Sequence, residues 1–398
     1  MNTIEASQTM QFPSSTSTVR VRLVDTTGVM VVNAKSLFEP VQPGHETLNI
    51  YVAAFLIEHV PSGEQVMFDL GIRKDYWNLP AVLQSRLSEV IPSLRVDKDV
   101  TDILQDSGIA LNDISTIIWS HYHWDHIGNT AIFPHSTKLV VGPGFKSRSN
   151  ILPGFPLAPN SPVEAKVFDQ RPLKEIDFSG TGLSIGGFPA YDFFGDGSFY
   201  LLDTPGHCIG HMCGLARTTP SPNASFVLLG GDICHFAGIF RPNIHMPLPD
   251  PMPLCSLFTD HHPRRAMAEL GDGSRTPFYL VSNDACSAHV DPKLAQRSVN
   301  SLAAFDSHPD VMVCLAHDED LIKHLPTLNN NPSDDLNSWK SRGFKEKIRW
   351  LWLNRLPQDG KPGQKPAVEG FWRNGQPWPS AKAELRNRAR EAFANYGL

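Results

Sequence analysis

Apolar residues along the chain follow two different spacings. Short runs of continuous or alternating apolar residues predict strands, and apolar residues three or four positions apart predict helices. Strands are predicted at 19–25, 51–57, 66–70, 116–119, 138–141, 199–203, 213–217, 226–232 and 311–316, and helices at 81–89, 97–105 and 292–305. Helices that lead into buried strands are typical of an α/β protein.

Four of these apolar strands end in residue types that bind metals. The strand at 116–119 runs into a cluster with H-x-H-x-D-H spacing, and three later strands each end in a single histidine or aspartate. In chain order these residues are His121, His123, Asp125, His126, His207, Asp232 and His317. A lone histidine is usually a surface residue, but this recurrence at strand ends indicates a shared metal site.

The two ends of the chain differ in composition from its middle. Residues 1–18 are polar and rich in Ser and Thr, so we expect a flexible N-terminus. A catalytic domain is predicted at 19–325. The stretch that follows is polar and Asn-rich, which marks the start of a C-terminal extension, 326–398, packed on that domain.

Two further segments have a distinctive pattern. Residues 344–356 have the spacing of a basic amphipathic helix with Trp350 and Trp352, for which packing on the domain is favoured over a membrane surface. The proline-rich segment 235–263 is long and irregular, and we expect it to be a binding loop or lid beside the site.

Composition excludes several classes of protein. The 398 residues are 41% hydrophobic, and 35 basic against 41 acidic residues give a formal charge of −6 without a basic block, which argues against a nucleic-acid partner. The N-terminus has no signal-peptide pattern, and no apolar run reaches membrane length. We therefore expect a cytoplasmic protein with no membrane partner; a homodimer is left open.

The six cysteines are spread along the chain and do not form a disulfide pattern. We expect them to be reduced, buried small residues. Cys208 and Cys234 lie near the predicted site and are minor candidates for a metal ligand or nucleophile.

Seven candidate ligands exceed what one closed structural zinc site needs, and they divide naturally over two metals. His121, His123 and His207 are assigned to one metal, and Asp125, His126 and His317 to the other, with Asp232 as the bridge. Imidazole and carboxylate ligands suit zinc and also iron, manganese or cobalt, so we expect two Zn²⁺ per chain, with Fe or Mn as alternatives.

Such a pair of metals supports hydrolysis. Two metals about 3.5–4 Å apart can hold a bridging hydroxide at neutral pH, which would attack a carbonyl carbon. Asp125 is placed to pass a proton onward, and no serine or cysteine nucleophile is required.

These residues resemble the metallo-β-lactamase superfamily, whose five motifs are matched in order over Val19 to His324: Asp69, the His121–His126 cluster, His207, Asp232 and His317. The resemblance implies an αββα sandwich of two mixed β-sheets flanked by helices. The run from Thr204 to His211 is most similar to the lactonase branch, and the run from Gly230 to Gly238 resembles fungal lactamase-like hydrolases.

Three other residues are interpreted through this resemblance. Lactonases of this branch carry a tyrosine three residues after the bridging aspartate, where it contacts the substrate carbonyl, and here His235 stands at that position. An imidazole could do the same work, so His235 is a second catalytic candidate beside Asp125. Asp69 either orients the metal loop or caps a turn, and His211 is interpreted as structural.

The favoured hypothesis is a dinuclear hydrolase that opens a small-molecule lactone or small lactam. An acyl thioesterase of a polyketide-type pathway would use the same metals, and a mononuclear iron persulfide dioxygenase shares the H-x-H-x-D-H motif. Flavin-linked diiron oxidoreductases fit badly because they prefer Glu where His123 stands. A metal-free binding module is disfavoured because every ligand position is intact.

Overall fold

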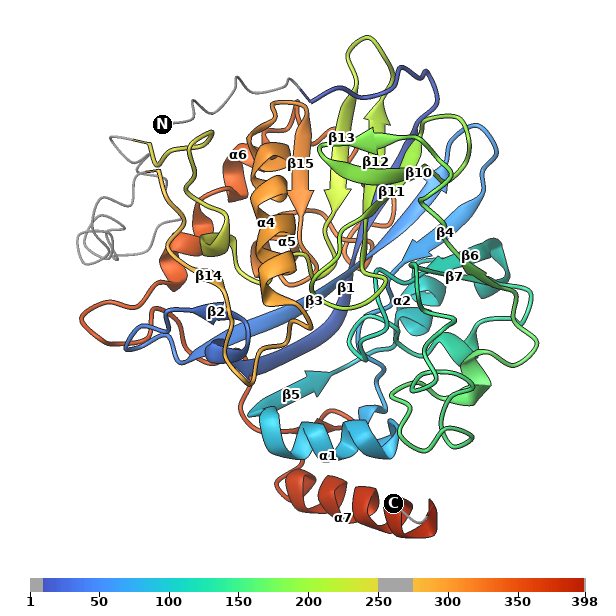
Figure 1. The fold of residues 1–398 in the computed structure, drawn as a ribbon, viewed down its shortest axis with the longest axis vertical. Coiled ribbons are helices and arrows are strands. Elements are labelled where there is room, and N and C mark those ends of the chain that lie inside the picture. The colour runs from blue at the N-terminus through green and yellow to red at the C-terminus, as the bar shows by residue number, and fades with distance from the viewer. Residues whose placement is uncertain (1–9, 250–274, 397–398) are drawn as a thin grey trace.

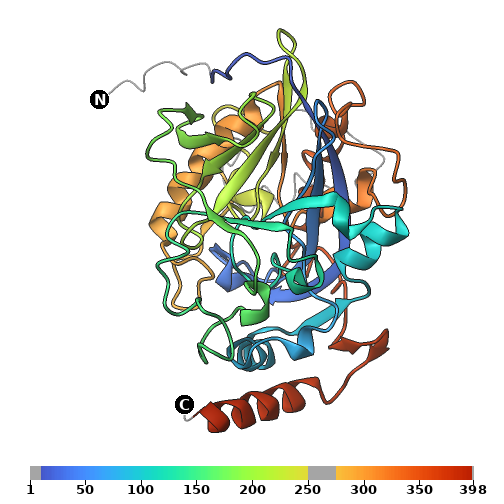
Figure 2. The same ribbon diagram turned by 90° about the vertical axis from the view of Figure 1, so that its right-hand side faces the viewer.

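A computed structural model describes residues 10–249 and 275–396. Two mixed β-sheets pack face to face, with helices on both outer sides (Figures 1 and 2). The first sheet has the order β5-β1-β3-β4-β6-β7-β8, and the second has the order β15-β13-β12-β11-β10-β9. This is the predicted αββα sandwich, so the predicted fold class is confirmed.

The bounds of the elements are as follows. The first sheet comprises β1 (Val19–Asn33), β3 (Thr47–His59), β4 (Gln65–Phe68), β5 (Ser93–Val96), β6 (Ile114–Ile118), β7 (Lys138–Val141) and β8 (Leu173–Glu175). The second comprises β9 (Ser184–Ile185), β10 (Phe188–Asp192), β11 (Phe199–Asp203), β12 (Met212–Thr219), β13 (Ser225–Leu229) and β15 (Val311–Cys314). Two short pairs are β2 (Phe38–Glu39) with β14 (Leu280–Val281), and β16 (Trp372–Arg373) with β17 (Gln376–Pro377).

The helices cover the outer faces. They are α1 (Ala81–Val90), α2 (Val100–Asp106), α4 (Pro292–Ser307), α5 (Glu319–His324), α6 (Phe344–Ile348) and α7 (Ala381–Tyr396). Short 3-10 turns are η1 (Ala34–Ser36), η2 (Tyr76–Asn78), η3 (Leu111–Asp113), η4 (Thr130–Ile132), η5 (Ala165–Val167), η6 (Ala237–Ile239) and η7 (Leu351–Arg355). Helix α4 packs on β15 of the second sheet, whereas α2 and α5 pack on β1 and β3 of the first.

A core of aromatic and aliphatic side chains lies between the two sheets. Phe55 and Phe68 of the first sheet and Phe199 and Val227 of the second are almost fully buried in one cluster. A side chain at Gly214 would stand 3.0 Å from Phe199 and 3.2 Å from Phe68, so glycine there lets the two rings meet between the sheets. Each buried phenylalanine contributes about 1.5–3 kcal/mol to this packing.

The C-terminal residues return to the first sheet. Strand β5 pairs with β1 only over Gly28–Val31, which leaves the backbone of Val19 to Asp25 without a strand on that side. Residues 328–337 run along this edge: Leu328 and Leu336 donate backbone N–H groups to β1, and the side-chain amides of Asn329 and Asn337 both donate to and accept from it. The edge of β1 is therefore covered by the chain itself.

The prediction of one continuous helix at 344–356 is wrong. The segment forms two short helices, α6 and η7, because the backbone of Trp350 leaves the helical region (φ −113°, ψ 2°). The break lets Trp350 and Trp352 both be buried, as the favoured packed interpretation expects. Helix α7, which packs against α1 (Figure 1), and the short strands β5 and β8 to β10 were not predicted.

Part of two predictions lies outside the described residues. The flexible N-terminus at 1–18 is described only from residue 10, where Phe12 stacks on Phe226 at 4.2 Å. The proline-rich segment 235–263 is described only to residue 249. Among the described residues, no helix is both long and apolar enough to cross a membrane.

Candidate metal centre

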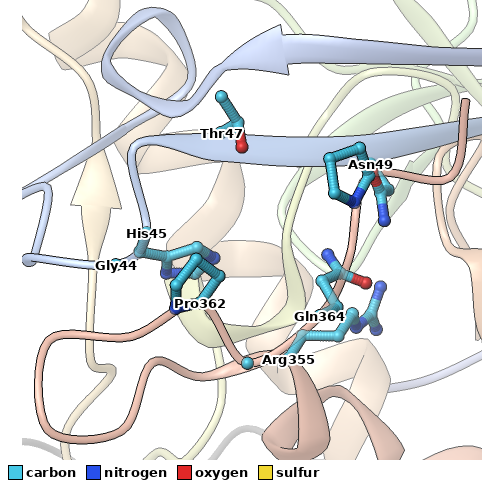
Figure 3. Close-up of a pocket in the computed structure, with 9 residues that line it drawn as sticks. Gly44, His45, Thr47, Asn49, Arg355, Pro362 and Gln364 are labelled. Atoms are coloured by element: carbon cyan, nitrogen blue, oxygen red, sulfur yellow. The ribbon is translucent and has the colours of Figure 1, made fainter. Parts of the chain in front are cut away.

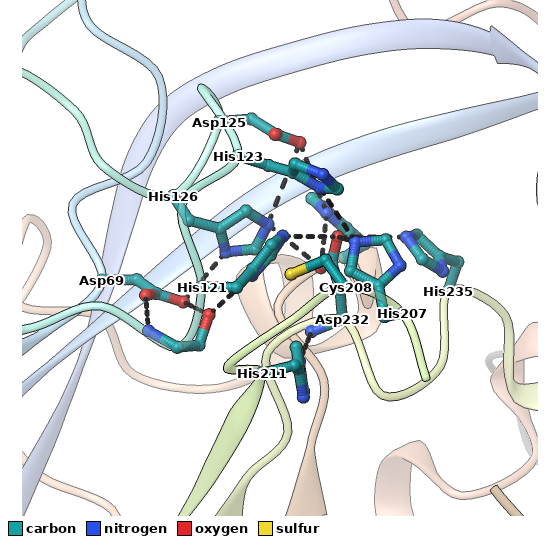
Figure 4. A network of polar contacts seen from close by, with 12 residues as sticks. Asp69, His121, His123, Asp125, His126, His207, Cys208, His211, Asp232 and His235 are labelled. Atoms are coloured by element: carbon teal, nitrogen blue, oxygen red, sulfur yellow. Dashed lines mark hydrogen bonds and ion pairs between the residues drawn. The ribbon is translucent and has the colours of Figure 1, made fainter. Parts of the chain in front are cut away.

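The ends of the strands β4, β6, β11, β13 and β15 meet at one end of the sandwich. The loop after β6 carries the histidine cluster, and the segments after β11, β13 and β15 carry His207, Asp232 and His317. All seven predicted ligands are brought together there, six of them labelled in Figure 4, and all except the half-buried His123 are buried. Their donor atoms fall into two groups that share Asp232.

The first donor group comprises His121, His123, His207 and Asp232. His207 Nε2 lies 2.9 Å from His123 Nδ1 and 3.3 Å from Asp232 Oδ2, and His121 Nε2 lies 3.6 Å from the same oxygen. Ligand atoms about 2.0–2.1 Å from a tetrahedral zinc would be separated by similar distances.

The second donor group comprises Asp125, His126 and His317, together with the other oxygen of Asp232. The Nε2 atoms of His126 and His317 each lie 3.0 Å from Asp232 Oδ1. Asp125 Oδ2 lies 3.6 Å from His317 Nε2 and 3.9 Å from His126 Nε2. The Asp232 carboxylate thus points one oxygen at each group.

Several of these donor atoms are buried and unsatisfied. His121 Nε2, His126 Nε2 and Asp232 Oδ1 have no hydrogen-bond partner within the described parts of the chain. A buried polar atom without a partner costs about 1–3 kcal/mol, and converging nitrogen and carboxylate lone pairs are what a divalent cation satisfies. The residues therefore fit a metal centre.

The histidines of the cluster divide into three with a lowered pKa and two, His126 and His317, with a raised pKa. Burial lowers the pKa of His121 and His207 well below the ordinary value, and that of His123 to about 4. Burial also lowers the pKa of His126, but the nearby carboxylates, Asp232 and Asp69 foremost, together outweigh it and raise that pKa well above the ordinary value. Burial opposes the charge of Asp232, yet the facing histidines hold the pKa of its carboxyl well below the ordinary value.

Asp69 orients the cluster, which decides between its two sequence interpretations. Its carboxylate accepts hydrogen bonds from Ser120 N (2.7 Å), Ser120 Oγ (2.7 Å) and His126 Nδ1 (2.9 Å). Because Ser120 Oγ gives its proton to Asp69, it accepts one from His121 Nδ1 at 3.0 Å. Both histidines are thereby held with Nε2 directed at the donor groups.

Two further contacts position the remaining ligands. His317 Nδ1 donates to the carbonyl of Tyr51 at 3.0 Å, which leaves its Nε2 lone pair free. His211 Nε2 accepts the backbone N–H of Asp232 at 2.9 Å, while its Nδ1 faces Thr204. His211 is thus structural, as expected: it fixes the backbone that carries Asp232.

His235 lies inside the cluster. Its Nε2 is 3.0 Å from Asp232 Oδ2, and its ring stacks on that of His317 with centroids 5.6 Å apart. Its Nδ1 is buried without a partner among the residues described. The predicted catalytic candidate is therefore adjacent to both donor groups.

His289 was not among the site residues predicted from the sequence. This buried residue precedes α4, and its Nδ1 lies 3.4 Å from His207 Nδ1. With His207 and His235 it forms a third group of ring nitrogens. No strand leads into His289, so the strand-end pattern that identified the other residues could not reveal it.

The cysteines near the site are not suited to catalysis. Cys208, Cys213 and Cys234 are buried free thiols, and burial raises the pKa of Cys213 and of Cys234 to about 12. The five cysteines in the described ranges are free, and Cys255 lies outside them. A thiol held protonated by burial is a poor nucleophile and metal ligand.

A small polar pocket lies between the start of β3 and the C-terminal residues 355–366 (Figure 3). It is lined by His45, Asn49, Arg355 and Gln364, among others. The Arg355 guanidinium also reaches Asp318 (3.3 Å) and Asp320 (2.8 Å) on the turn that follows His317. The C-terminal residues therefore brace the segment that carries one of the predicted ligands.

Known proteins are similar to this chain in sequence and in fold. The family model described as the metallo-beta-lactamase superfamily matches residues 49–256. Gamma-lactamase FDB1 of Fusarium pseudograminearum is 43% identical over 88% of this chain and 85% of its own length. Metallo-hydrolase mfmC of Annulohypoxylon moriforme is 35% identical over 86% of this chain and 88% of its own.

Solved structures add support for the fold alone. A variant of B. thuringiensis AiiA with N-decanoyl-L-homoserine bound at its active site superposes with a TM-score of 0.50 at 18% identity. The match covers 79% of this chain and 98% of that one.

Proposed function

Because the chain belongs to the metallo-beta-lactamase superfamily and is a metal-dependent hydrolase, we propose that it opens a small cyclic amide or ester at a two-metal centre. The proposed ligands are His121, His123 and His207 for one metal and Asp125, His126 and His317 for the other, with Asp232 bridging. Zinc is the proposed metal, since nitrogen-rich sites with carboxylates suit it.

The observation that carries this proposal is the divided carboxylate of Asp232. One oxygen lies 3.0 Å from two histidines of the second group, and the other lies 3.3 and 3.6 Å from two histidines of the first. A single iron ion would leave one donor group without a role. The geometry therefore favours two metals over the mononuclear dioxygenase alternative.

A lactam is the first substrate class to test. The relative that is 43% identical over most of both chains is named a gamma-lactamase. A lactone ring presents a similar carbonyl to the same groups and serves as the comparison. The described residues give no specific support to an acyl thioester, which enters the test as a third probe.

Two divalent metals, when bound, would lower the pKa of a shared water and so supply a hydroxide near neutral pH. Hydrolysis of the ring would form a C–O bond at the carbonyl carbon and then break the C–N bond, and the leaving ring nitrogen would take up a proton. Asp125 is proposed to accept the proton from the attacking group and pass it to the leaving nitrogen. His235, beside Asp232, is proposed to hydrogen-bond the substrate carbonyl.

The remaining predictions are proposed with this function. Five free cysteines in the described ranges, four of them buried and Cys286 exposed against expectation, support a cytoplasmic location. The hydrogen bonds between residues 328–337 and β1 support an extension, 326–398, packed on a catalytic domain at 19–325.

The test compares wild-type protein with Asp232→Asn, which keeps the shape of the side chain. Zinc-loaded protein is incubated with γ-lactams, γ-lactones and acyl thioesters. Mass spectrometry then measures ring-opened products that are heavier than the substrate by one water, or the acid and the thiol released from a thioester. Turnover of a lactam that is lost on chelation and in Asp232→Asn, together with bound metal, supports the proposal. Full turnover by Asp232→Asn with two metals still bound would refute the bridging role.

A further inference from the structure

Each ligand candidate whose Nε2 faces the donor groups has a defined partner for its other ring nitrogen, Nδ1. In His121 the partner is Ser120 Oγ, in His126 it is Asp69, and in His317 it is the Tyr51 carbonyl. Ligating histidines almost always donate their second N–H in this way, which fixes the tautomer and the orientation of the ring. In His207 the partner is neither a carboxylate nor a carbonyl but the imidazole of His289.

We propose that His289 is a positioning residue that holds His207 in the tautomer needed to bind a metal. A ligating Nε2 must carry a lone pair, so the proton of a neutral His207 must sit on Nδ1. That proton can only be donated to His289 Nδ1, 3.4 Å away, because two N–H groups cannot face each other. His289 must then carry its own proton on Nε2.

The backbone holds this pair in place. The N–H groups of Val290 and Asp291 donate to the carbonyls of His207 (2.8 Å) and Gly206 (3.0 Å). Asp291 then caps α4 by accepting the N–H of Leu294, so the segment is anchored at the helix. The two rings meet edge to face with centroids 5.0 Å apart. His289 is thus held against His207 by contacts that do not depend on either imidazole.

The inferred tautomer has a consequence for the second nitrogen. His289 Nε2 is buried without a hydrogen-bond partner among the described residues, next to the ring of His235 at 5.2 Å. A buried N–H in that state is costly. This tautomer of His289 therefore costs free energy at Nε2, as expected if its role is to accept the proton of His207 at Nδ1.

The test uses two substitutions of equal shape. Asn carries an oxygen near the position of the histidine Nδ1 and can accept the proton of His207, whereas Leu has the same outline and no acceptor. In His289→Leu, affinity for one of two zinc equivalents should fall about 10–100-fold, whereas His289→Asn should stay within about 3-fold of wild type. Affinities are measured by competition with a chromophoric chelator, and thermal unfolding of the metal-free variants checks folding.

A second measurement needs no variant. Nitrogen-15 NMR of zinc-loaded wild-type protein distinguishes protonated from unprotonated ring nitrogens, and should show the proton of His207 on Nδ1 and that of His289 on Nε2. A proton on His289 Nδ1 would overturn the inference, as would wild-type zinc affinity in folded His289→Leu or an equal loss in His289→Asn.

This inference rests on the proposed function only in that His207 binds a metal, and the two fail separately. Protein that binds two zinc ions with the expected tautomers but opens no lactam or lactone refutes the proposed reaction and supports the role of His289. Protein that binds no metal refutes both.

Discussion

Asp69→Asn is the substitution that tests the architecture of the metal loop most directly. Asp69 is 2% exposed, and its two oxygens accept three hydrogen bonds at 2.7, 2.7 and 2.9 Å. Asn has the same shape but replaces one oxygen with an NH₂ group. Because every partner of Asp69 is itself a donor, at least one of the three contacts becomes a meeting of two donors.

The expected magnitude follows from these contacts. A hydrogen bond to a charged group is worth about 1.5–3 kcal/mol, so the metal-free variant should lose at least about that much unfolding free energy. Because the ring of His126 would lose the hydrogen bond at its Nδ1 that orients it, zinc affinity should fall about 10–100-fold. Urea unfolding measures the first quantity, and chelator competition measures the second.

A matched control separates this effect from the loss of a negative charge. Asp106 pairs with Lys98 at the surface at 2.6 Å, with 61% of the Asp106 side chain exposed. Asp106→Asn should change the unfolding free energy by less than about 1 kcal/mol and leave zinc affinity unchanged. If Asp69→Asn bound two zinc ions with wild-type affinity, the idea that Asp69 orients the loop would have to be abandoned.

Three further outcomes are expected. His235→Phe should keep both metals but lower turnover about 100–1000-fold, measured as kcat beside metal content, because it removes the imidazole proposed to hydrogen-bond the substrate carbonyl. Burial, aided by the charge of Arg355, lowers the pKa of His45 to about 4. Between pH 6.5 and 4 the unfolded chain therefore binds a proton at His45 that the folded protein does not bind. Stability should therefore fall as the pH falls through this window, and in His45→Asn that fall should be smaller by up to about 3 kcal/mol in urea titrations of metal-free protein. Arg171 is buried and donates to five backbone carbonyls between Thr130 and Val167. Arg171→Met should therefore lower the free energy of unfolding by about 3–5 kcal/mol, and a loss below about 1 kcal/mol would show that those carbonyls find other partners.

The sequence predicts most of this site because its logic is local. A buried strand followed directly by a histidine or aspartate is visible in the residues themselves, and the seven predicted residues do meet in the folded chain. Parallel neighbours such as β4 and β6, or β13 and β15, place their carboxyl ends at one edge.

What escaped prediction depends on contacts between distant segments. His289 meets His207 only because the backbone at 290–291 pairs with that at 206–207, and nothing near His289 in the sequence announces this. The role of Asp69 stayed open because its three partners are chosen by a turn with a positive φ of 61°. The break at Trp350 follows from burial of two neighbouring tryptophans, which outweighs helical spacing.

The covering of β1 by residues 328–337 has a consequence for how the protein behaves outside its native state. An uncovered strand edge of this length is a template for pairing with another chain, and Val19, Val21 and Leu23 give this part of β1 one apolar face. The asparagine amides at this edge therefore satisfy backbone groups of β1 that could otherwise pair with another chain. Loss of the last seventy or so residues would uncover this edge and also remove Arg355, so we expect such a chain to associate with itself as well as to lose the ion pairs that brace the segment after His317.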